Sequence, residues 1–243
     1  MADLHQNVIK DDKWFYAFRD YEGIRASLKR NKHVIHFQEF GAGSASHNAG
    51  ERTISKIAQN ALSYPYQCRL MFRLVHFLEC QHILELGTSL GVSSLYLGGA
   101  RKDAVVYTLE GDPASFQMAN HIFSQMEMDN IRPILGQFSK TVPQVISDLP
   151  KIDLAFIDGH HDGLATSEYY HQIKEKTHEQ SVIIIDDIYW SDDMNSAWIE
   201  ITKRPEVTFS IDLFFCGIIF FRPFSNASKT SFKVRPDKVI FHL

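Results

Sequence analysis

Residues 82–97 read HILELGTSLGVSSLYL, and this stretch decides the fold. His82–Gly87 is a short apolar run, typical of a buried strand, and an apolar helix opens near Gly91. Glycines at the junction let the backbone approach a ligand closely. A strand, a glycine turn and a helix in this order therefore indicate a binding turn at the end of a strand.

The rest of the chain repeats this alternation. Further strands are expected at 105–110, 131–136, 152–158 and 181–186, and helices at 113–128, 139–149, from 159 to about 178, and at 194–202. Near-continuous apolar strands separated by helices indicate a parallel sheet covered on both faces. Val207–Phe214 and Gly217–Arg222 are two more strands joined by a short connection, so this pair must be antiparallel. We therefore expect an α/β, Rossmann-like sheet of seven mostly parallel strands.

The first eighty residues are expected to be helical. Helices are predicted over 12–32 and 53–79, with Pro65 dividing the second one, and residues 41–50 form a flexible link rich in glycine, serine and asparagine. The tail at 225–243 is expected to be a terminal strand or a packing arm. The chain is thus interpreted as one domain: a helical extension (1–80), a binding core (81–224) and a tail (225–243).

A second glycine stretch, His33–Ser44, competes for the role of binding turn. Its apolar alternation runs into Gly41 and Gly43, but the residues that follow are polar and lack a helical apolar stripe. No strand ending in an acid follows at the expected interval either. We interpret this stretch as a loop.

Composition excludes several classes of protein. The 243 residues are 44% apolar and 22% charged, with a formal charge of −4, so there is no basic field to attract nucleic acid or an anionic membrane. Three cysteines form no metal-binding spacing, which suits a reducing compartment. The N-terminus lacks the apolar core of a signal peptide, and the most apolar stretch, 211–221, is too short to span a bilayer. We expect a soluble, cytoplasmic protein.

An acid closes the second strand of the core. Glu110 lies 23 residues after Gly87, where a carboxylate can accept both hydroxyls of a ribose. A nicotinamide cofactor would favour Gly-x-Gly-x-x-Gly, whereas residues 85–91 have the pattern E-x-G-x-x-x-G. This pattern resembles that of class I S-adenosylmethionine-dependent methyltransferases, and the resemblance covers about 64–222. It implies the strand order 3-2-1-4-5-7-6 and S-adenosylmethionine held by Glu85, Gly87, Thr88, Ser89, Gly91 and Glu110.

Acids also follow two later strands: Asp158 comes after the fourth, and Asp186 and Asp187 close the fifth. If these strands are neighbours, the three carboxylates meet at the edge where open α/β sheets bind ligands. Their repulsion would require a proton or a cation, and oxygen ligands suit Mg²⁺, Ca²⁺ or Mn²⁺. The alternative is that Asp158 turns the chain and Asp187 caps a helix.

Here the resemblance narrows to enzymes similar to catechol O-methyltransferase. In that family one acid after the fourth strand and an acid–asparagine pair after the fifth hold Mg²⁺, so Asp158, Asp186 and Asp187 fall on metal positions. His161 stands where the family has a lysine base, which implies that His161 and Asp158 are catalytic. A second group of methyltransferases, acting on sugar and natural-product hydroxyls, has Ile-Asp-Gly-x-His and resembles residues 157–161 more closely.

The same resemblance implies further cofactor contacts. They are an adenine-binding turn at Gly136, Gln137 and Phe138, a contact of Ser93 with the methionine end, and a contact by Asp158. His160 is a cofactor contact beside the adenine, a partner of a site residue or a surface residue, and we favour the cofactor contact. Trp190, Asp192, Asp193 and Trp198 are possible substrate-lining residues. Phe214, Phe215, Ile218 and Phe220 are interpreted as sheet core.

The favoured function is a metal-assisted O-methyltransferase acting on a small hydroxylated molecule, catechol-like or a natural product. The alternatives are a methyltransferase acting on tRNA or protein, a metal-independent small-molecule methyltransferase, and a cofactor-binding module without catalysis. Only scattered basic residues support nucleic acid as a partner, so we expect none. Relatives suggest a homodimer.

Overall fold

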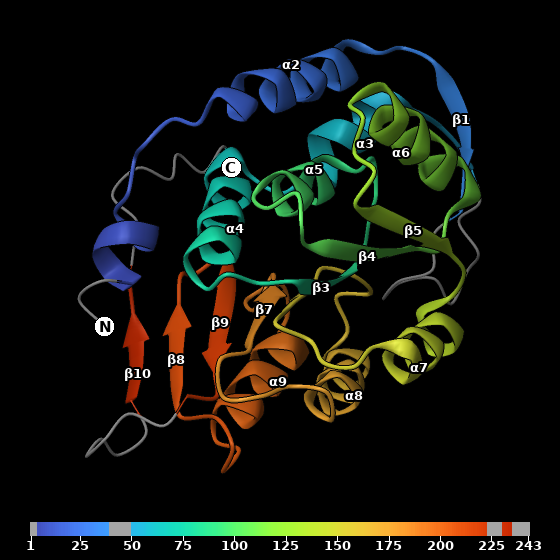
Figure 1. The fold of residues 1–243 in the computed structure, drawn as a ribbon. Coiled ribbons are helices and arrows are strands. Elements are labelled where there is room, and N and C mark those ends of the chain that lie inside the picture. The colour runs from blue at the N-terminus through green and yellow to red at the C-terminus, as the bar shows by residue number, and fades with distance from the viewer. Residues whose placement is uncertain (1–3, 39–49, 223–229, 235–243) are drawn as a thin grey trace. The chain divides into compact units, whose positions relative to one another are not determined.

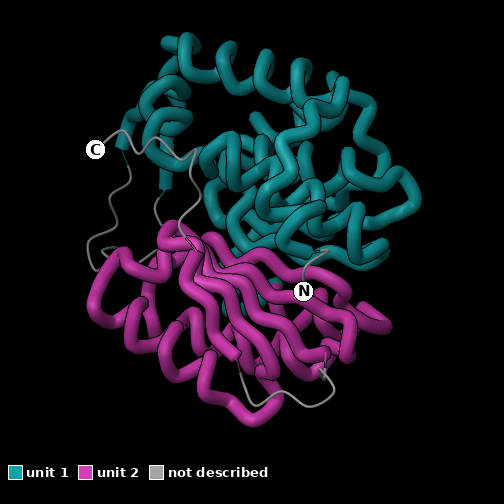
Figure 2. The backbone as a smooth tube through the Cα atoms, turned by 90° about the vertical axis from the view of Figure 1, so that its left-hand side faces the viewer, with its two compact units in different colours: residues 1–141 teal, residues 142–243 magenta. Residues whose placement is uncertain are grey.

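A computed structural model describes residues 4–38, 50–222 and 230–234 (Figure 1). Most of the glycine-rich link at 41–50 and most of the tail at 225–243 therefore lie outside the described residues. The chain divides into two compact units, residues 1–141 and residues 142–243 (Figure 2).

The first unit holds most of the helices. Its helical elements are η1 (His5–Ile9), α2 (Tyr16–Arg30), α3 (Ile54–Asn60), α4 (Pro65–Phe77), α5 (Val92–Gly99), α6 (Pro113–Gln125) and the start of α7 (Phe138–Asp148). Its strands are β1 (Val34–Phe37), β2 (Gly50–Thr53), β3 (His82–Leu86), β4 (Val105–Glu110) and β5 (Ile131–Leu135). The predicted division at Pro65 is confirmed, because proline opens α4 at a position where its missing N–H costs nothing.

Strands β3, β4 and β5 pair in parallel, with β4 in the middle. The interpretation of 33–44 as a loop is wrong for Val34–Phe37. This segment is a strand and pairs antiparallel with Gly50–Thr53, forming a two-stranded ribbon that packs against α6. Gly41 and Gly43 lie outside the described residues.

Helix α2 is part of the core of the first unit. It packs on α3 and α5, and Phe18 places its ring 4.9 Å from Phe72 of α4 and 5.2 Å from Tyr96 of α5. Aromatic rings at such distances attract one another beyond the area that they bury. The N-terminal helices are therefore packed on the helix that follows the glycine turn.

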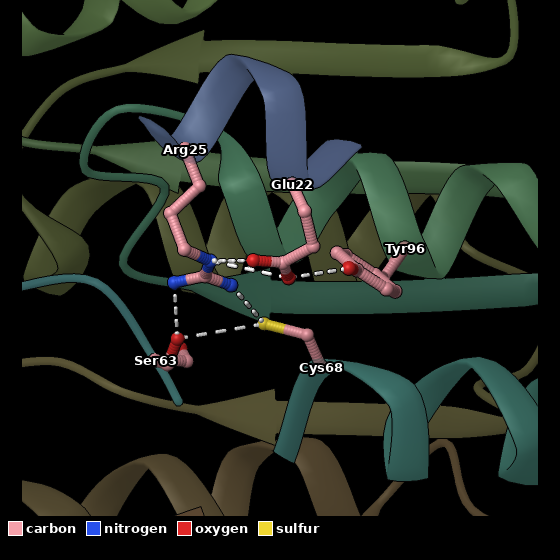
Figure 3. A network of polar contacts seen from close by, with 5 residues as sticks. All are labelled: Glu22, Arg25, Ser63, Cys68 and Tyr96. Atoms are coloured by element: carbon pink, nitrogen blue, oxygen red, sulfur yellow. Dashed lines mark hydrogen bonds and ion pairs between the residues drawn. The ribbon is translucent and has the colours of Figure 1, made fainter. Parts of the chain in front are cut away.

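A buried polar network joins these helices (Figure 3). Arg25 of α2 bonds the carboxylate of Glu22 at 3.1 Å, the backbone oxygen of Ser63 at 2.7 Å and the sulfur of Cys68 at 3.2 Å. Tyr96 donates its hydroxyl to Glu22 at 2.7 Å. Burial raises the pKa of Cys68 to about 11, so this residue stays a thiol and Glu22 is the counter-charge of Arg25.

The second unit contains the rest of the sheet. Its strands are β6 (Leu154–Ile157), β7 (Val182–Asp186), β8 (Phe209–Asp212), β9 (Cys216–Phe220) and β10 (Thr230–Lys233), and its helices are α8 (Gly163–Lys174) and α9 (Asp192–Thr202). Helices α8 and α9 pack on each other (Figure 1). Every residue of β6 and β7 is buried, as expected for parallel strands covered on both faces.

The predicted hairpin is confirmed, because β9 is antiparallel to both β8 and β7. Strand β10 adds to β8 in parallel, so the described part of the tail is a terminal strand.

These strands define a mostly parallel mixed sheet of the expected Rossmann-like type, with eight strands among the described residues instead of the seven expected. The order β5-β4-β3 matches the expected 3-2-1, and β6-β7-β9-β8 matches 4-5-7-6. None of the helices in the described part of the chain is both long and apolar enough to cross a bilayer.

Candidate active site

The glycine turn of the first unit is held by backbone hydrogen bonds to β4. The amides of Gly87 and Thr88 both donate to the carbonyl of Leu109, at 3.0 and 3.1 Å. Gly91 caps α5 with a φ of +81°, and a Cβ atom there would lie 2.7 Å from the ring of Phe123. Glycine is thus required at Gly91 by its backbone conformation and by the close approach of α6.

Glu110 lies directly against this turn. One of its oxygens accepts the amide of Ser89 at 2.7 Å, and the other accepts the amide of Asp112 at 2.8 Å. Burial raises the pKa of Glu110 to about 7, although these amide donors act in the opposite direction. Each carboxylate oxygen retains a second lone pair, so the predicted ribose contact is compatible with these bonds.

The structure places three predicted cofactor residues in the interior of the first unit. Glu85 is fully buried and accepts hydrogen bonds from Ser94 and, at 2.6 Å, from Thr108. Burial raises the pKa of Glu85. Thr88 is also buried, with its hydroxyl 2.5 Å from that of Thr108, and Ser93 is buried at the start of α5. The side chains of Glu85 and Thr88 therefore stabilise the glycine turn from the interior of the first unit, through Thr108 of β4.

The predicted adenine-binding turn directly follows β5. Gly136 has a φ of +150° and donates its amide to the carbonyl of Glu110 at 2.8 Å, which links this turn to the acid. Gln137 is exposed, whereas Phe138 is buried at the start of α7.

The acids after the fourth and fifth core strands lie on neighbouring strands of the second unit. Strands β6 and β7 are parallel, with Ile157 opposite Ile185, so Asp158 and Asp186 each follow one member of this pair. Asp186 is buried, and Asp187 is half-buried next to it. The expectation that the two strands are neighbours is confirmed.

His161 and Asp187, a predicted catalytic residue and a predicted metal residue, are in contact. Nδ1 of His161 lies 3.5 Å from Oδ2 of Asp187, and the imidazole ring lies 5.4 Å from the ring of Trp190 at an interplanar angle of 34°. Burial raises the pKa of Asp187, and the nearby His161 opposes this change. An imidazole held by a carboxylate and left partly exposed can accept a proton.

The backbone is strained at these positions. His160, His161 and Asp187 have φ values of +69°, +44° and +51°, in the left-handed region that non-glycine residues rarely adopt. Such conformations concentrate at functional sites, where the surrounding structure fixes them. The strain therefore supports a functional interpretation of these loops.

His160 has a different environment. Its Nδ1 lies 2.7 Å from the hydroxyl of Tyr169 on α8, and the two rings are 5.7 Å apart. The predicted cofactor contact of His160 thus stays a prediction, and the bond to Tyr169 fixes the orientation of the ring.

The described residues contain no cluster of three or more histidine, cysteine, aspartate or glutamate side chains arranged to bind a metal ion. The carboxylates nevertheless act on one buried group, the thiol of Cys216. Its pKa is raised well above the usual value, first by burial and then by the charges of Asp186, Asp187, Asp212 and Asp158. Carboxylate oxygens suit a hard divalent cation, but the described residues do not bring three such side chains together as a metal site. The metal site therefore stays a prediction.

Two interpretations of the aromatic residues were wrong. Trp198 is buried, with Gly217 of β9 against its ring, so it belongs to the core instead of a substrate mouth. Phe214 is partly exposed and stacks on Tyr189 at 5.4 Å, whereas Phe215, Ile218 and Phe220 are buried as expected. Gly217 has no side chain, which leaves room for the ring of Trp198 in the core. Phe214 has a φ of +76°, and this left-handed backbone conformation interrupts the alternation expected of a strand.

Three residues that contact one another in the second unit were not predicted from the sequence: Tyr189, Asp212 and Lys233. Asp212 is the last residue of β8, just as Glu110 and Asp186 are the last residues of β4 and β7. This position at a strand end is the feature from which Asp212 could have been selected. The contact between Tyr189 and Lys233 joins residues 44 positions apart, and no periodicity in the sequence predicts it.

Comparison with solved structures identifies the fold as that of class I methyltransferases. The Bacillus cereus O-methyltransferase in complex with SAH has a TM-score of 0.63 and 15% identity, over 90% of this chain and 96% of that one. The Streptomyces achromogenes O-methyltransferase TomG, involved in tomaymycin synthesis and bound to SAM, has a TM-score of 0.62 and 16% identity, over 91% and 95%. The SAH-bound Podospora anserina methyltransferase PaMTH1 has a TM-score of 0.60 and 16% identity, over 88% and 100%.

The sequence itself points to the same class. Residues 84–188 match the Methyltransf_24 family model, which is described as a methyltransferase domain. The comparison with curated proteins gives no significant match. The chain carries a methyltransferase domain, and the recognition of a class I, S-adenosylmethionine-dependent methyltransferase is confirmed.

Proposed function

We propose that this protein transfers a methyl group from S-adenosylmethionine to an oxygen atom of a small hydroxylated molecule. The observation that carries the proposal is the contact between His161 and Asp187 at the ends of β6 and β7. A neutral hydroxyl is a poor nucleophile, so a transferase acting on oxygen needs a group that removes the proton. His161 is that group in our proposal.

The first unit would hold the methyl donor. Glu110 would accept the ribose hydroxyls, since its carboxylate already lies against the glycine turn through the amide of Ser89. Gly87 and Gly91 would let the backbone approach the donor. Gln137 and Phe138 would contact the adenine, as the family resemblance implies.

The second unit would hold the acceptor and the proton. Asp187 would orient the imidazole of His161 and stabilise its positive charge after proton transfer, as a carboxylate does in a histidine–carboxylate pair. The acceptor oxygen would then attack the sulfonium methyl carbon in line, which requires the two atoms to be held about 3 to 3.5 Å apart. Methyl transfer leaves S-adenosylhomocysteine and a methyl ether, and the proton stays on His161 until solvent removes it.

The acceptor surface would be aromatic. Trp190 is 65% exposed, although its ring lies beside that of His161. A large exposed aromatic side chain next to a catalytic group favours a ligand with a flat face, because stacking buries apolar area at little entropic cost. A catechol-like ring fits this surface.

A divalent cation would be held by Asp158, Asp186 and Asp187. Bound there, it would lower the pKa of a coordinated hydroxyl. Asp187 in place of the family's asparagine adds one negative charge, which favours cation binding. A metal-independent reaction is the second candidate, and the direct contact of His161 with Asp187 favours it, because this pair alone can accept the proton.

The test is methyl transfer to 3,4-dihydroxybenzoate, measured with Mg²⁺ and with EDTA, together with the Kd of S-adenosylhomocysteine. We expect a methyl ether with Mg²⁺, little product with EDTA and the same Kd in both. Equal transfer in EDTA would select the metal-independent candidate. Absence of transfer under both conditions, with the donor bound, would contradict the proposed acceptor class. Cytoplasmic location and a homodimer stay predictions.

A further inference from the structure

Asp212 is a buried carboxylate outside the predicted site, and both of its oxygens are used. The side chain ends β8 and is 7% exposed. Oδ1 accepts the backbone amide of Phe214 at 2.8 Å, and Oδ2 accepts the hydroxyl of Tyr189 at 2.6 Å. A buried carboxylate is costly unless it is paired, so this arrangement requires a nearby cation.

Lys233 of β10 supplies that cation. Its Nζ atom lies 3.4 Å from Oδ2 of Asp212, donates to the hydroxyl of Tyr189 at 2.6 Å and lies 4.7 Å from the centre of the Tyr189 ring. Tyr189 is therefore fixed by a donor, an acceptor and a cation above its face. Strand β10 is the strand that exceeds the seven expected from the sequence.

Tyr189 lies in the short segment that carries the proposed chemistry. The amide of Asp187 donates to the carbonyl of Phe215 at 2.8 Å, and the amide of Trp190 donates to the carbonyl of Asp187 at 2.8 Å. The ring of Tyr189 stacks on that of Phe214. Backbone bonds thus hold the start and end of the segment 187–190, and Tyr189 is its side-chain attachment to β8 and β10.

We propose that Asp212, Tyr189 and Lys233 are positioning residues, which hold the segment 187–190 so that Trp190 and Asp187 stay against His161. They act through Trp190 and Asp187 and touch neither donor nor acceptor. The effect of this positioning on catalysis rests on the proposed function. The positioning itself can be tested in the folded chain without any reaction.

The test uses 5-fluorotryptophan and ¹⁹F NMR on the full chain loaded with S-adenosylhomocysteine. The three tryptophans give three signals, assigned by replacing each with phenylalanine. Trp190 reports on the segment, Trp198 on the core of the second unit, and Trp14 on the first unit. Tyr189→Phe removes one hydroxyl, and Lys233→Met removes the cation.

We expect both variants to shift or broaden the Trp190 signal and to leave those of Trp14 and Trp198 in place. Lys233→Arg keeps the positive charge, so its Trp190 signal should match that of the wild type. Ser231→Ala is the matched control, because it removes a 3.1 Å hydrogen bond between β10 and Ser210 of β8 without touching Tyr189. An unchanged Trp190 signal in Tyr189→Phe and Lys233→Met, or the same change in Ser231→Ala, would overturn the proposal.

Titration with 3,4-dihydroxybenzoate separates the two proposals. In the wild type we expect the ligand to move the Trp190 signal. In Tyr189→Phe we expect a Kd about tenfold higher, because Trp190 is no longer held in place to stack on the ligand. A wild-type signal that does not respond to the ligand would contradict the proposed acceptor class alone. An equal Kd in both proteins would contradict the positioning role.

Discussion

Nδ1 of His161 lies 3.5 Å from Oδ2 of Asp187, and both residues have left-handed backbone conformations. His161 follows β6, and Asp187 follows the neighbouring strand β7. Two strained residues on adjacent loops that bring a base and a carboxylate together are more consistent with a site than with a pair of chain turns. Proton removal by His161 therefore stays our proposal.

Replacing His161 should abolish transfer without affecting the donor. We expect His161→Ala to lower kcat by about 10²- to 10⁴-fold, the usual contribution of a general base. The Kd of S-adenosylhomocysteine, measured by calorimetry, should stay within twofold. His171→Ala is the matched control, since His171 lies on α8, contacts Arg204 and should leave kcat unchanged when it is replaced. Full activity of His161→Ala would refute the role.

Donor affinity should depend on the charge of Glu110. Burial raises the pKa of this carboxyl to about 7, so it is ionised above neutral pH and protonated below. Ribose hydroxyls donate to the ionised form, so lowering the pH from 8 to 6 should weaken binding of S-adenosylhomocysteine about tenfold. Glu110→Gln should bind weakly and with little pH dependence. A flat pH profile in the wild type would contradict the ribose contact.

Two glycines should respond in opposite directions to alanine. Gly91→Ala places a Cβ atom 2.7 Å from Phe123 and forces alanine to a φ of +81°, so the free energy of unfolding should fall by about 2 kcal/mol or more. Gly23 lies in α2 with open space around it. Because glycine destabilises a helix relative to alanine, Gly23→Ala should raise the free energy of unfolding by about 0.5 to 1 kcal/mol. Urea denaturation measures both. Equal effects would mean that the packing of α5 on α6 is not tight.

The network around Arg25 should be important for stability (Figure 3). Arg25→Met leaves Glu22 without its counter-charge and removes the 2.7 Å hydrogen bond to the Ser63 carbonyl, so the free energy of unfolding should fall by about 3 kcal/mol. Arg19→Met is the control, because the pair of Arg19 with Asp20 is exposed and should contribute about 0 to 1 kcal/mol. A loss in Arg25→Met no larger than in Arg19→Met would show that the network is not stabilising.

The core strands were predictable because each is a short apolar run between helices. Val105–Glu110 is a strand over the predicted residues, and the antiparallel pairing of β8 and β9 followed from their short connection. The β1–β2 ribbon was missed, because the residues of β2, Gly50–Thr53, are polar and lack an apolar alternation. Propensity alone did not reveal a strand whose pairing partner supplies its stability.

The positions of the candidate site residues in the fold could be predicted from the sequence, whereas the contacts between their side chains could not. The acids after β6 and β7 follow from strand ends, and the parallel pairing makes them neighbours. The contact of His161 with Asp187 instead depends on left-handed backbone at both residues, which no local pattern required. The burial of Glu85 was likewise hidden, because the hydroxyls of Ser94 and Thr108 that bind it come from other elements.

The most direct test of the central claim is transfer from S-adenosylmethionine carrying a deuterated methyl group, with 3,4-dihydroxybenzoate and Mg²⁺, followed by mass spectrometry. We expect a deuterated methyl ether and an equal amount of S-adenosylhomocysteine. Donor that binds but yields no labelled ether, or a label on an atom other than oxygen, would contradict it.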